Sequence, residues 1–285
     1  MKTAKTDRFV WRKLSPSKWD DVWQERLGWL KERLVIINFS GKPTSRLEAY
    51  HLKKSEADEL VKEFGGQLRK DKPMTAKDLE PEPRAPIQIR GKLLIVSSVK
   101  EQRKALKEQP HIVSLLIPAS FAFGTGEHIT TATCLRMIAD VTGALTPGKW
   151  EALDLGTGSG ILAMAARVLG AKKVEAADHD ESAIRAAKEN AAVNKITGLT
   201  LKRFNVLNWK PTRQWPLVTA NLFSPILIAA AKQITAAVAP GGTLILSGIL
   251  AIQADEVVSA FKKLGVRFDK IVRKGKWVTC LGIRK

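Results

Sequence analysis

One turn constrains the fold of this chain more than any other stretch, and it begins at Asp154. It follows a short apolar run, 151–155, and leads into a segment, 161–169, whose apolar residues have helical spacing and which Gly170 ends. The turn carries glycine at three alternate positions, Gly156, Gly158 and Gly160. A backbone that turns this tightly and lets a ligand lie against it needs glycine, because a Cβ would block both. The pattern predicts a strand, a tight turn and a helix.

The spacing and charge of this turn indicate a class of ligand. Pyridine-dinucleotide sites space their glycines G-x-G-x-x-G, but here the third glycine comes one residue early and Ile161 stands where that pattern needs glycine. Asp154 would repel a phosphate and would hold an ammonium group. The next apolar run, 173–178, ends in Asp178, which can accept hydrogen bonds from both hydroxyls of a ribose. S-adenosylmethionine fits this description, and the alternative is an ordinary tight connection that binds nothing.

A second glycine-rich turn, 123–128, lies upstream, and the segment between the two turns reads as one helix. We expect both turns to close on the same small molecule. Thr130 and Thr131 begin that helix, so they either contact the ligand or cap the helix. Phe121 and Phe123 either cover the ligand or pack in the interior.

The rest of the C-terminal part alternates strands with helices. The expected helices are 181–193, about 225–238 and about 253–264, and the expected strands are 199–204, 216–221, 243–247 and a hairpin over 266–281. Such repeats predict a mostly parallel sheet with helices on both faces and an antiparallel terminal hairpin. Ligands of such sheets bind beyond the carboxyl ends of the strands, where Asp154, Asp178 and Asn221 stand.

Residues 8–71 show a different order, β-α-β-β-α-β, which predicts a smaller α+β domain of the ferredoxin-like type. Ser15 and Pro16 are expected to open its first helix, with Trp19, Trp23, Leu27 and Leu30 as the apolar stripe. The predicted domains are 1–71, a linker at 72–86 rich in proline and charge, and 87–285. Two apolar runs, 93–96 and 113–116, should pack on the second domain.

The net charge of +19 is the one unusual bulk property, and it is spread along the chain, which indicates an acidic partner or setting. An apolar fraction of 45% is enough for a buried core. Cys134 and Cys280 lack metal-ligand spacing, so we expect free thiols, no metal site and a cytoplasmic location. Lys232 interrupts the best candidate for a membrane span, so none is expected.

Four stretches together resemble the PrmA family of ribosomal-protein methyltransferases. They are 122–131 with its FGTGxHxTT pattern, 153–162, 220–222 and 241–248, and the segment 276–282 is similar too. The resemblance covers roughly 86–285. It departs from the family pattern at Pro118-Ala119-Ser120, where Asp-Pro-Gly is usual, and at Ile129, where proline is usual.

This resemblance implies a class I methyltransferase that methylates amines on the eleventh protein of the large ribosomal subunit, with S-adenosylmethionine as donor. The family's donor-site positions fall on Thr131, Gly156, Asp178 and Asn221. It also implies an N-terminal ferredoxin-like domain that presents the substrate. We expect a monomer, with ribosomal RNA as a second candidate partner.

The chemistry requires a neutral amine, and Asn221 offers a carbonyl either to that amine or to the donor's own amino group; its alternative role is helix capping. His128 is a candidate base, and Asn205 a candidate for the adenine amino group. Two other functions stay open. One is an RNA methyltransferase whose N-terminal domain stacks bases on Trp11 or Tyr50, and the other is a ribosome-assembly module that binds the donor without turnover.

Overall fold

A computed structural model describes residues 9–39, 43–70, 85–118, 126 and 128–285. The chain divides into two compact units, Met1–Leu79 and Glu80–Lys285, here called the N-terminal and the C-terminal unit. None of the described helices has both the length and the apolar character needed to cross a membrane. The predicted linker lies almost wholly outside the described residues.

The N-terminal unit is a four-stranded antiparallel sheet with strand order β2-β3-β1-β4. Its elements are β1 (Phe9–Pro16), η1 (Ser17–Trp19), α1 (Asp20–Arg26), η2 (Gly28–Arg33), β2 (Leu34–Asn38), β3 (Thr44–Leu52), α2 (Lys54–Phe64) and β4 (Gln67–Lys70). This is the predicted ferredoxin-like order. Both helices cover the same face of the sheet, because Leu27 and Leu60 share one core cluster with Trp11 and Leu47.

Two local predictions for this unit were wrong. Ser15 belongs to β1 and does not cap the first helix; its hydroxyl accepts a hydrogen bond of 2.7 Å from Trp23 Nε1. Trp19 is 48% exposed, so it is not part of the apolar stripe, although Leu27 and Leu30 are buried. The helix is only seven residues long and is flanked by 3-10 turns, which rotate Trp19 away from the stripe.

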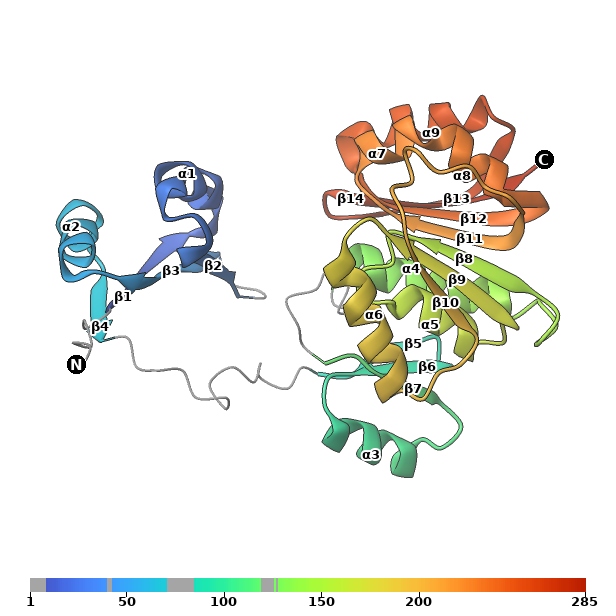
Figure 1. The fold of residues 1–285 in the computed structure, drawn as a ribbon, viewed down its shortest axis with the longest axis horizontal. Helices are drawn as coiled ribbons and strands as arrows, with labels where there is room; N and C mark the ends of the chain where they lie inside the picture. The colour runs from blue at the N-terminus through green and yellow to red at the C-terminus, as the bar shows by residue number, and fades with distance from the viewer. Residues whose placement is uncertain (1–8, 40–42, 71–84, 119–125, 127) are drawn as a thin grey trace, which may run out of the picture. The chain divides into compact units, whose positions relative to one another are not determined.

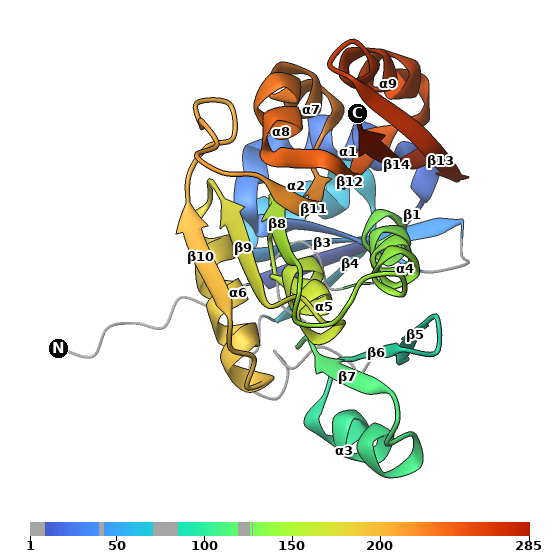
Figure 2. The ribbon, with the colours of Figure 1, turned by 90° about the vertical axis from the view of Figure 1, so that its right-hand side faces the viewer.

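The C-terminal unit is built on a seven-stranded sheet with order β10-β9-β8-β11-β12-β14-β13 (Figures 1 and 2). The strands are β8 (Glu151–Leu155), β9 (Lys173–Asp178), β10 (Leu199–Arg203), β11 (Trp215–Asn221), β12 (Val238–Leu250), β13 (Val266–Lys274) and β14 (Trp277–Arg284). The first five strands pair in parallel, and β14 runs antiparallel to both of its neighbours. The predicted class I methyltransferase topology, with its antiparallel hairpin, is therefore confirmed.

Helices cover both faces of this sheet (Figure 1). One face holds α4 (Ile129–Thr142), α5 (Ile161–Val168) and α6 (Glu181–Val193). The other holds α7 (Ser224–Ala229), α8 (Ala231–Ala237) and α9 (Ala254–Lys262), which η3 (Ala251–Gln253) precedes. The helix predicted over 225–238 is two helices, because the chain leaves helical geometry at Ala230 (φ −97°, ψ 10°).

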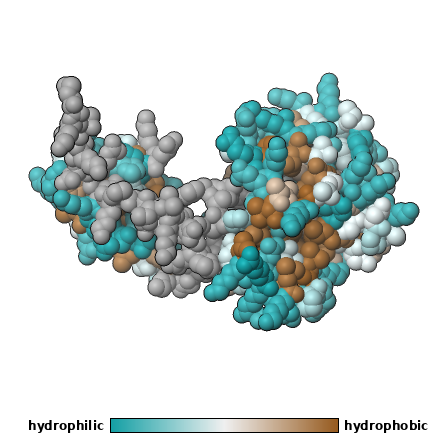
Figure 3. All heavy atoms as spheres, turned by 60° about the horizontal axis from the view of Figure 1, so that its bottom comes forward, coloured by the Kyte–Doolittle hydropathy of each residue, from teal (hydrophilic) through white to brown (hydrophobic). Residues whose placement is uncertain are grey.

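A small three-stranded sheet, β5 (Ile87–Ile89), β6 (Leu93–Val96) and β7 (Val113–Leu116), joins the C-terminal unit. Leu93, Ile95 and Leu115 share the core cluster of α4 and α5, as the two apolar runs predicted. The helix between them, α3 (Val99–Glu108), was not predicted, although Ser98 and Glu101 form a capping box at its start. On the face of this unit seen in Figure 3, apolar patches are bordered by hydrophilic side chains.

Candidate functional site

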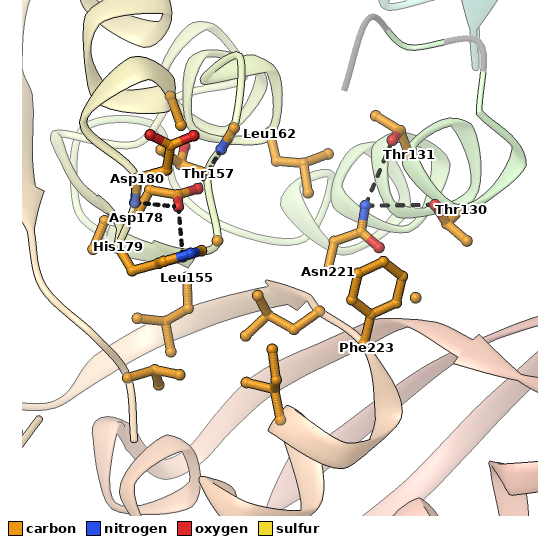
Figure 4. Close-up of a pocket in the computed structure, with 18 of the residues that line it drawn as sticks. Thr130, Thr131, Leu155, Thr157, Leu162, Asp178, His179, Asp180, Asn221 and Phe223 are labelled. Atoms are coloured by element: carbon orange, nitrogen blue, oxygen red, sulfur yellow. Dashed lines mark hydrogen bonds and ion pairs between the residues drawn. The ribbon is translucent and has the colours of Figure 1, made fainter. Parts of the chain in front are cut away.

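A cavity of about 510 Å³ opens at the carboxyl ends of β8, β9 and β11 (Figure 4). Its walls come from the glycine turn after β8, the start of α4, the loop after β10 and the residues that follow β11. A volume of this size is typical of small-molecule sites. Parallel strands that end at one edge therefore bring together residues far apart in the sequence.

The glycine turn lines the cavity through Gly156 and Gly158. Its three glycines all have left-handed backbone, with φ of +71°, +52° and +81° at Gly156, Gly158 and Gly160. A Cβ on Gly156 would lie 2.3 Å from Leu222 Cδ2, which is also in the cavity wall. The amides of Gly156 and Thr157 both donate to Ala177 O, so the turn is tied to the end of β9. Only glycine fits this conformation and this contact.

Asp178 stands at the end of β9 with its carboxylate against the turn. Oδ2 accepts a hydrogen bond of 3.0 Å from the Gly158 amide, and Oδ1 accepts one of 3.1 Å from the Asp180 amide. His179 Nδ1 lies 3.2 Å from the same Oδ1. The side chain is only 10% exposed, yet Asp178 lines the cavity. Backbone amides therefore hold an anionic acceptor in a fixed orientation at the cavity wall.

Asp154 lies under the turn and is not among the residues that line the cavity. It is 1% exposed, and its two oxygens accept hydrogen bonds from Thr219 Oγ1 (2.6 Å) and Thr157 Oγ1 (2.7 Å). Burial raises the pKa of Asp154 to about 6, although both hydroxyls act to lower it. In this structure Asp154 anchors the turn through Thr157. Its contact with an ammonium group stays a prediction.

Asn221 ends β11 and faces the first residues of α4 across the cavity. Its Nδ2 lies 3.5 Å from both Thr130 Oγ1 and Thr131 Oγ1. Figure 4 shows the amide oxygen turned away from the two threonines. Because Asn221 sits at a strand end with its nitrogen directed at hydroxyls, its carbonyl is the group left to accept a hydrogen bond from a ligand.

His128 and Trp277 close the cavity on the α4 side. His128 Nδ1 lies 2.6 Å from Thr130 Oγ1, and its ring packs edge-on against Trp277 with centroids 5.1 Å apart. Burial, with a smaller effect of the nearby Lys276, lowers the pKa of His128. The imidazole is therefore mostly neutral at neutral pH, and in the tautomer with its proton on Nε2 its Nδ1 accepts a hydrogen bond from the Thr130 hydroxyl. A catalytic-base role for His128 stays a prediction.

Asn205 lines the opposite end of the cavity, after β10. Its Oδ1 accepts a hydrogen bond of 3.0 Å from the Leu207 amide, so it also fixes the turn that carries it. Phe204, Val206 and Leu207 make this end of the wall apolar, and Phe204 stacks on Trp209 with centroids 4.9 Å apart. An apolar slot with one polar group suits a planar heterocycle.

Most of the predicted site residues meet in this cavity: Thr131, Gly156, Gly158, Asp178, Asn205 and Asn221 line it, together with Thr130 and His128. Phe121 and Phe123 lie outside the described residues. The sequence analysis missed Leu222, Ile226, Gly248 and Trp277. Gly248 carried an available signal, because it comes directly after the apolar run 243–247, although the structure places it within β12. Trp277 carried only the similarity of the segment 276–282 to the family, since its place in the wall depends on the terminal hairpin.

Comparison with known proteins adds a family to this geometry. The profile described as "Ribosomal protein L11 methyltransferase (PrmA)" matches residues 44–285. A protein of Listeria monocytogenes named ribosomal protein L11 methyltransferase is 34% identical over 256 residues, which cover 84% of this chain and 79% of that protein. A protein of the same name from Agrobacterium fabrum is 43% identical over 183 residues, 63% of this chain and 62% of its own length.

A solved structure, the ribosomal protein L11 methylase of Lactobacillus delbrueckii subsp. bulgaricus, superposes with a TM-score of 0.62 and 29% identity. The superposition covers 70% of this chain and 98% of that one. The family profile reaches from β3 of the N-terminal unit to the end of the chain, so it includes every described residue that lines the cavity. This chain belongs to the family of ribosomal protein L11 methyltransferases, PrmA.

Proposed function

We propose that this methyltransferase transfers methyl groups from S-adenosylmethionine to amines of ribosomal protein L11, on lysine side chains, the N-terminal α-amine or both. One observation carries the proposal. In a chain of this family, the fixed carboxylate of Asp178 and the free carbonyl of Asn221 lie in one cavity beside a left-handed glycine turn. The named relatives support the choice of substrate.

The residues present fit the donor. A ribose can donate its two hydroxyls to the Asp178 carboxylate, and the adenine can lie in the apolar slot near Phe204 with Asn205 at its edge. Gly156 has no side chain to keep the donor away from the backbone, and a Cβ at this position would collide with Leu222. Asp178 and Asp180 offer no favourable place for a phosphate. When bound, the donor supplies an electrophilic methyl group on a sulfonium.

The chain's own residues must bind the substrate amine in its neutral form and hold it in line with the methyl group. A lysine with a pKa near 10.4 costs about 4–5 kcal/mol to deprotonate at pH 7, whereas an α-amine near 8 costs only about 1 kcal/mol. We assign Asn221 Oδ1 as the acceptor that holds the neutral amine. Thr130 and Thr131 accept hydrogen bonds from Asn221 Nδ2, and Thr130 is in turn paired with His128 Nδ1, so these neighbours fix the direction of the Asn221 carbonyl.

The N-terminal unit is the proposed site of substrate recognition, since the described residues that line the donor cavity all lie within 128–277. Its domain limits, 1–71 with a linker at 72–86 and the catalytic part at 87–285, stay a proposal. The proposal further includes that the enzyme acts as a monomer in the cytoplasm, where ribosomal proteins are made, and that it contacts ribosomal RNA.

The test is an assay with tritiated S-adenosylmethionine against ribosomal protein L11 and against ribosomal RNA. We expect label in the protein, and about 100-fold slower labelling with the Asn221→Ala variant as control. Label in RNA alone would instead indicate an RNA methyltransferase, and label in neither would indicate a binding module without turnover. Digesting the modified protein and weighing its peptides then identifies which amines are methylated and how many times.

A further inference from the structure

A second hollow of the C-terminal unit, of about 740 Å³, lies between β5, α4 and β13. The helix α4 contributes to both hollows: Thr130 and Thr131 line the donor cavity, whereas Ile129 and Arg136 line the second one. We call the second hollow the basic groove and define it by its charged residues. These are Arg90, Arg136, Asp140, Lys270 and Lys274.

The periodicity of the three elements places these charges on one surface. Lys270 and Lys274 share a face of β13 with Val272, because side chains two residues apart on a strand point the same way. Arg136 and Asp140 are four residues apart on α4 and so lie on one face of that helix. The floor between them is aliphatic and includes Ile129, Met137 and Val272.

The groove has more positive charge than its own residues neutralise. Asp140 accepts an ion pair from Arg90 at 2.8 Å and another from Lys270 at 3.4 Å. Within the described part of the chain, neither Arg136 nor Lys274 has a carboxylate at ion-pair distance. Four cations around one carboxylate repel one another, and an anion in the groove relieves that repulsion.

We propose that the basic groove binds the phosphate backbone of RNA. Lys270 and Lys274 leave the strand about 13 Å apart at 3.3 Å per residue, so the positive charge extends along the groove, which suits a polyanion. Arginine guanidinium groups match phosphate geometry, and the aliphatic floor can hold sugars. Contacts to phosphates and sugars carry no sequence information, so we expect this binding to depend little on base sequence.

The charge of the surrounding chain favours the same partner. Residues 201–285, which include β13, carry 14 basic and only 3 acidic side chains. Such a field attracts nucleic acid from a distance and adds a salt-dependent part to the affinity. The groove would let the enzyme hold RNA while its donor cavity, on the other face of α4, stays open to an amine.

The test compares two full-length double variants that lose the same charge. Arg136→Gln with Lys274→Gln removes the two groove cations that have no ion pair with Asp140, whereas Lys262→Gln with Lys263→Gln removes two exposed lysines at the end of α9, on the other face of the sheet. Binding of a short fluorescent single-stranded RNA of mixed sequence is followed by anisotropy at several salt concentrations. We expect the groove variant to bind at least about tenfold more weakly and its log–log salt slope to be smaller by about 1.4, while the α9 variant changes little.

Equal losses in both variants, or no loss in the groove variant, would overturn the proposal in favour of diffuse charge. Polyglutamate that binds as tightly as RNA and depends equally on the groove would show an acidic-protein site instead. Donor affinity, measured by calorimetry, should stay unchanged in the groove variant. If donor affinity falls, the double variant has disturbed α4. RNA binding by Lys274→Gln alone, a residue outside α4, then decides whether the groove binds RNA. RNA binding and methyl transfer are measured in separate assays. A failure to methylate the ribosomal protein would therefore refute the proposed function without changing the conclusion on RNA binding.

Discussion

Asp154 is a carboxylate that the fold keeps almost wholly out of water, and this gives the protein a pH-dependent cost. Its pKa is raised from 3.8 to about 6 by burial. Between these values the folded state holds a proton that the unfolded state has released, so the free energy of unfolding falls as pH rises through the window from 3.8 to about 6. The loss amounts to about 3 kcal/mol at neutral pH.

We predict that Asp154→Asn lacks this loss. The difference in unfolding free energy, variant minus parent, should rise by about 2 kcal/mol between pH 4 and pH 7. Taking the difference cancels the other titrating groups. Urea titrations in which hydrogen exchange of β8 peptides reports unfolding of the C-terminal unit measure it. A difference that stays flat with pH would mean that Asp154 titrates normally.

Asp178 is expected to determine donor affinity. Asp178→Ala removes two charge-assisted hydrogen bonds to the ribose, each worth about 1.5–3 kcal/mol, so calorimetry should show donor binding weakened by at least about 100-fold. Glu181→Ala is the matched control, since it removes the same charge three residues away, at a side chain that pairs with Arg203 outside the cavity. Unchanged affinity in Asp178→Ala would refute the assignment.

Asn221 and Asn205 are two amides in one cavity with different expected roles. Asn221→Ala should lower kcat by about 100-fold or more because it removes the acceptor of the neutral amine. Asn205→Ala should raise the KM for the donor and leave kcat nearly unchanged. Steady-state kinetics with saturating ribosomal protein L11 separates the two. A similar fall in kcat in both variants would contradict the assignment of Asn221 as the acceptor of the substrate amine.

At the scale of elements, two effects of the glycine turn can be measured separately: its left-handed backbone and its contact with Leu222. Gly156 and Gly241 have nearly the same φ, +71° and +72°, but a Cβ at 241 meets nothing within 4 Å, whereas one at 156 meets Leu222 Cδ2 at 2.3 Å. Both alanine variants should lose about 1–2 kcal/mol of stability from the left-handed backbone. Only Gly156→Ala should also weaken donor binding, since it displaces Leu222 in the cavity wall. Equal donor affinity in the two variants would contradict this account.

The elements also show what could be read from the sequence. The order of the strands of the large sheet and the ends of β8, β9 and β11 were predictable, because buried parallel strands are short apolar runs and their polar terminal residues are local signals. The position of Trp277 was not predictable, since it depends on long-range pairing of β12 with β14. Nor was the burial of Asp154, because its partner Thr219 comes from a different strand. The α4 residues that line the basic groove have helical spacing in the sequence, but the sequence does not indicate that β13 lies beside them.

For the whole molecule, the division into two units predicts how ligands act on stability. The core of the N-terminal unit is one cluster around Trp11, whereas the C-terminal unit has its own clusters on the two faces of the large sheet. Every described residue that lines the donor cavity belongs to the C-terminal unit. A ligand stabilises only the unit that binds it, by about 2.7 kcal/mol at a concentration of 100 Kd.

We therefore predict two transitions in calorimetric melting of the full chain, of which S-adenosylmethionine raises only one. For a unit of this size the rise should be about 5–10 °C at that concentration. Asp178→Ala should remove the shift. Trp11→Phe, which loses the indole hydrogen bond of 2.7 Å to Gly65 O in the N-terminal unit, should lower the other transition and keep the shift. A single transition that moves as one with donor would mean that the two units unfold cooperatively, and substrate recognition would then be coupled to donor binding through the fold itself.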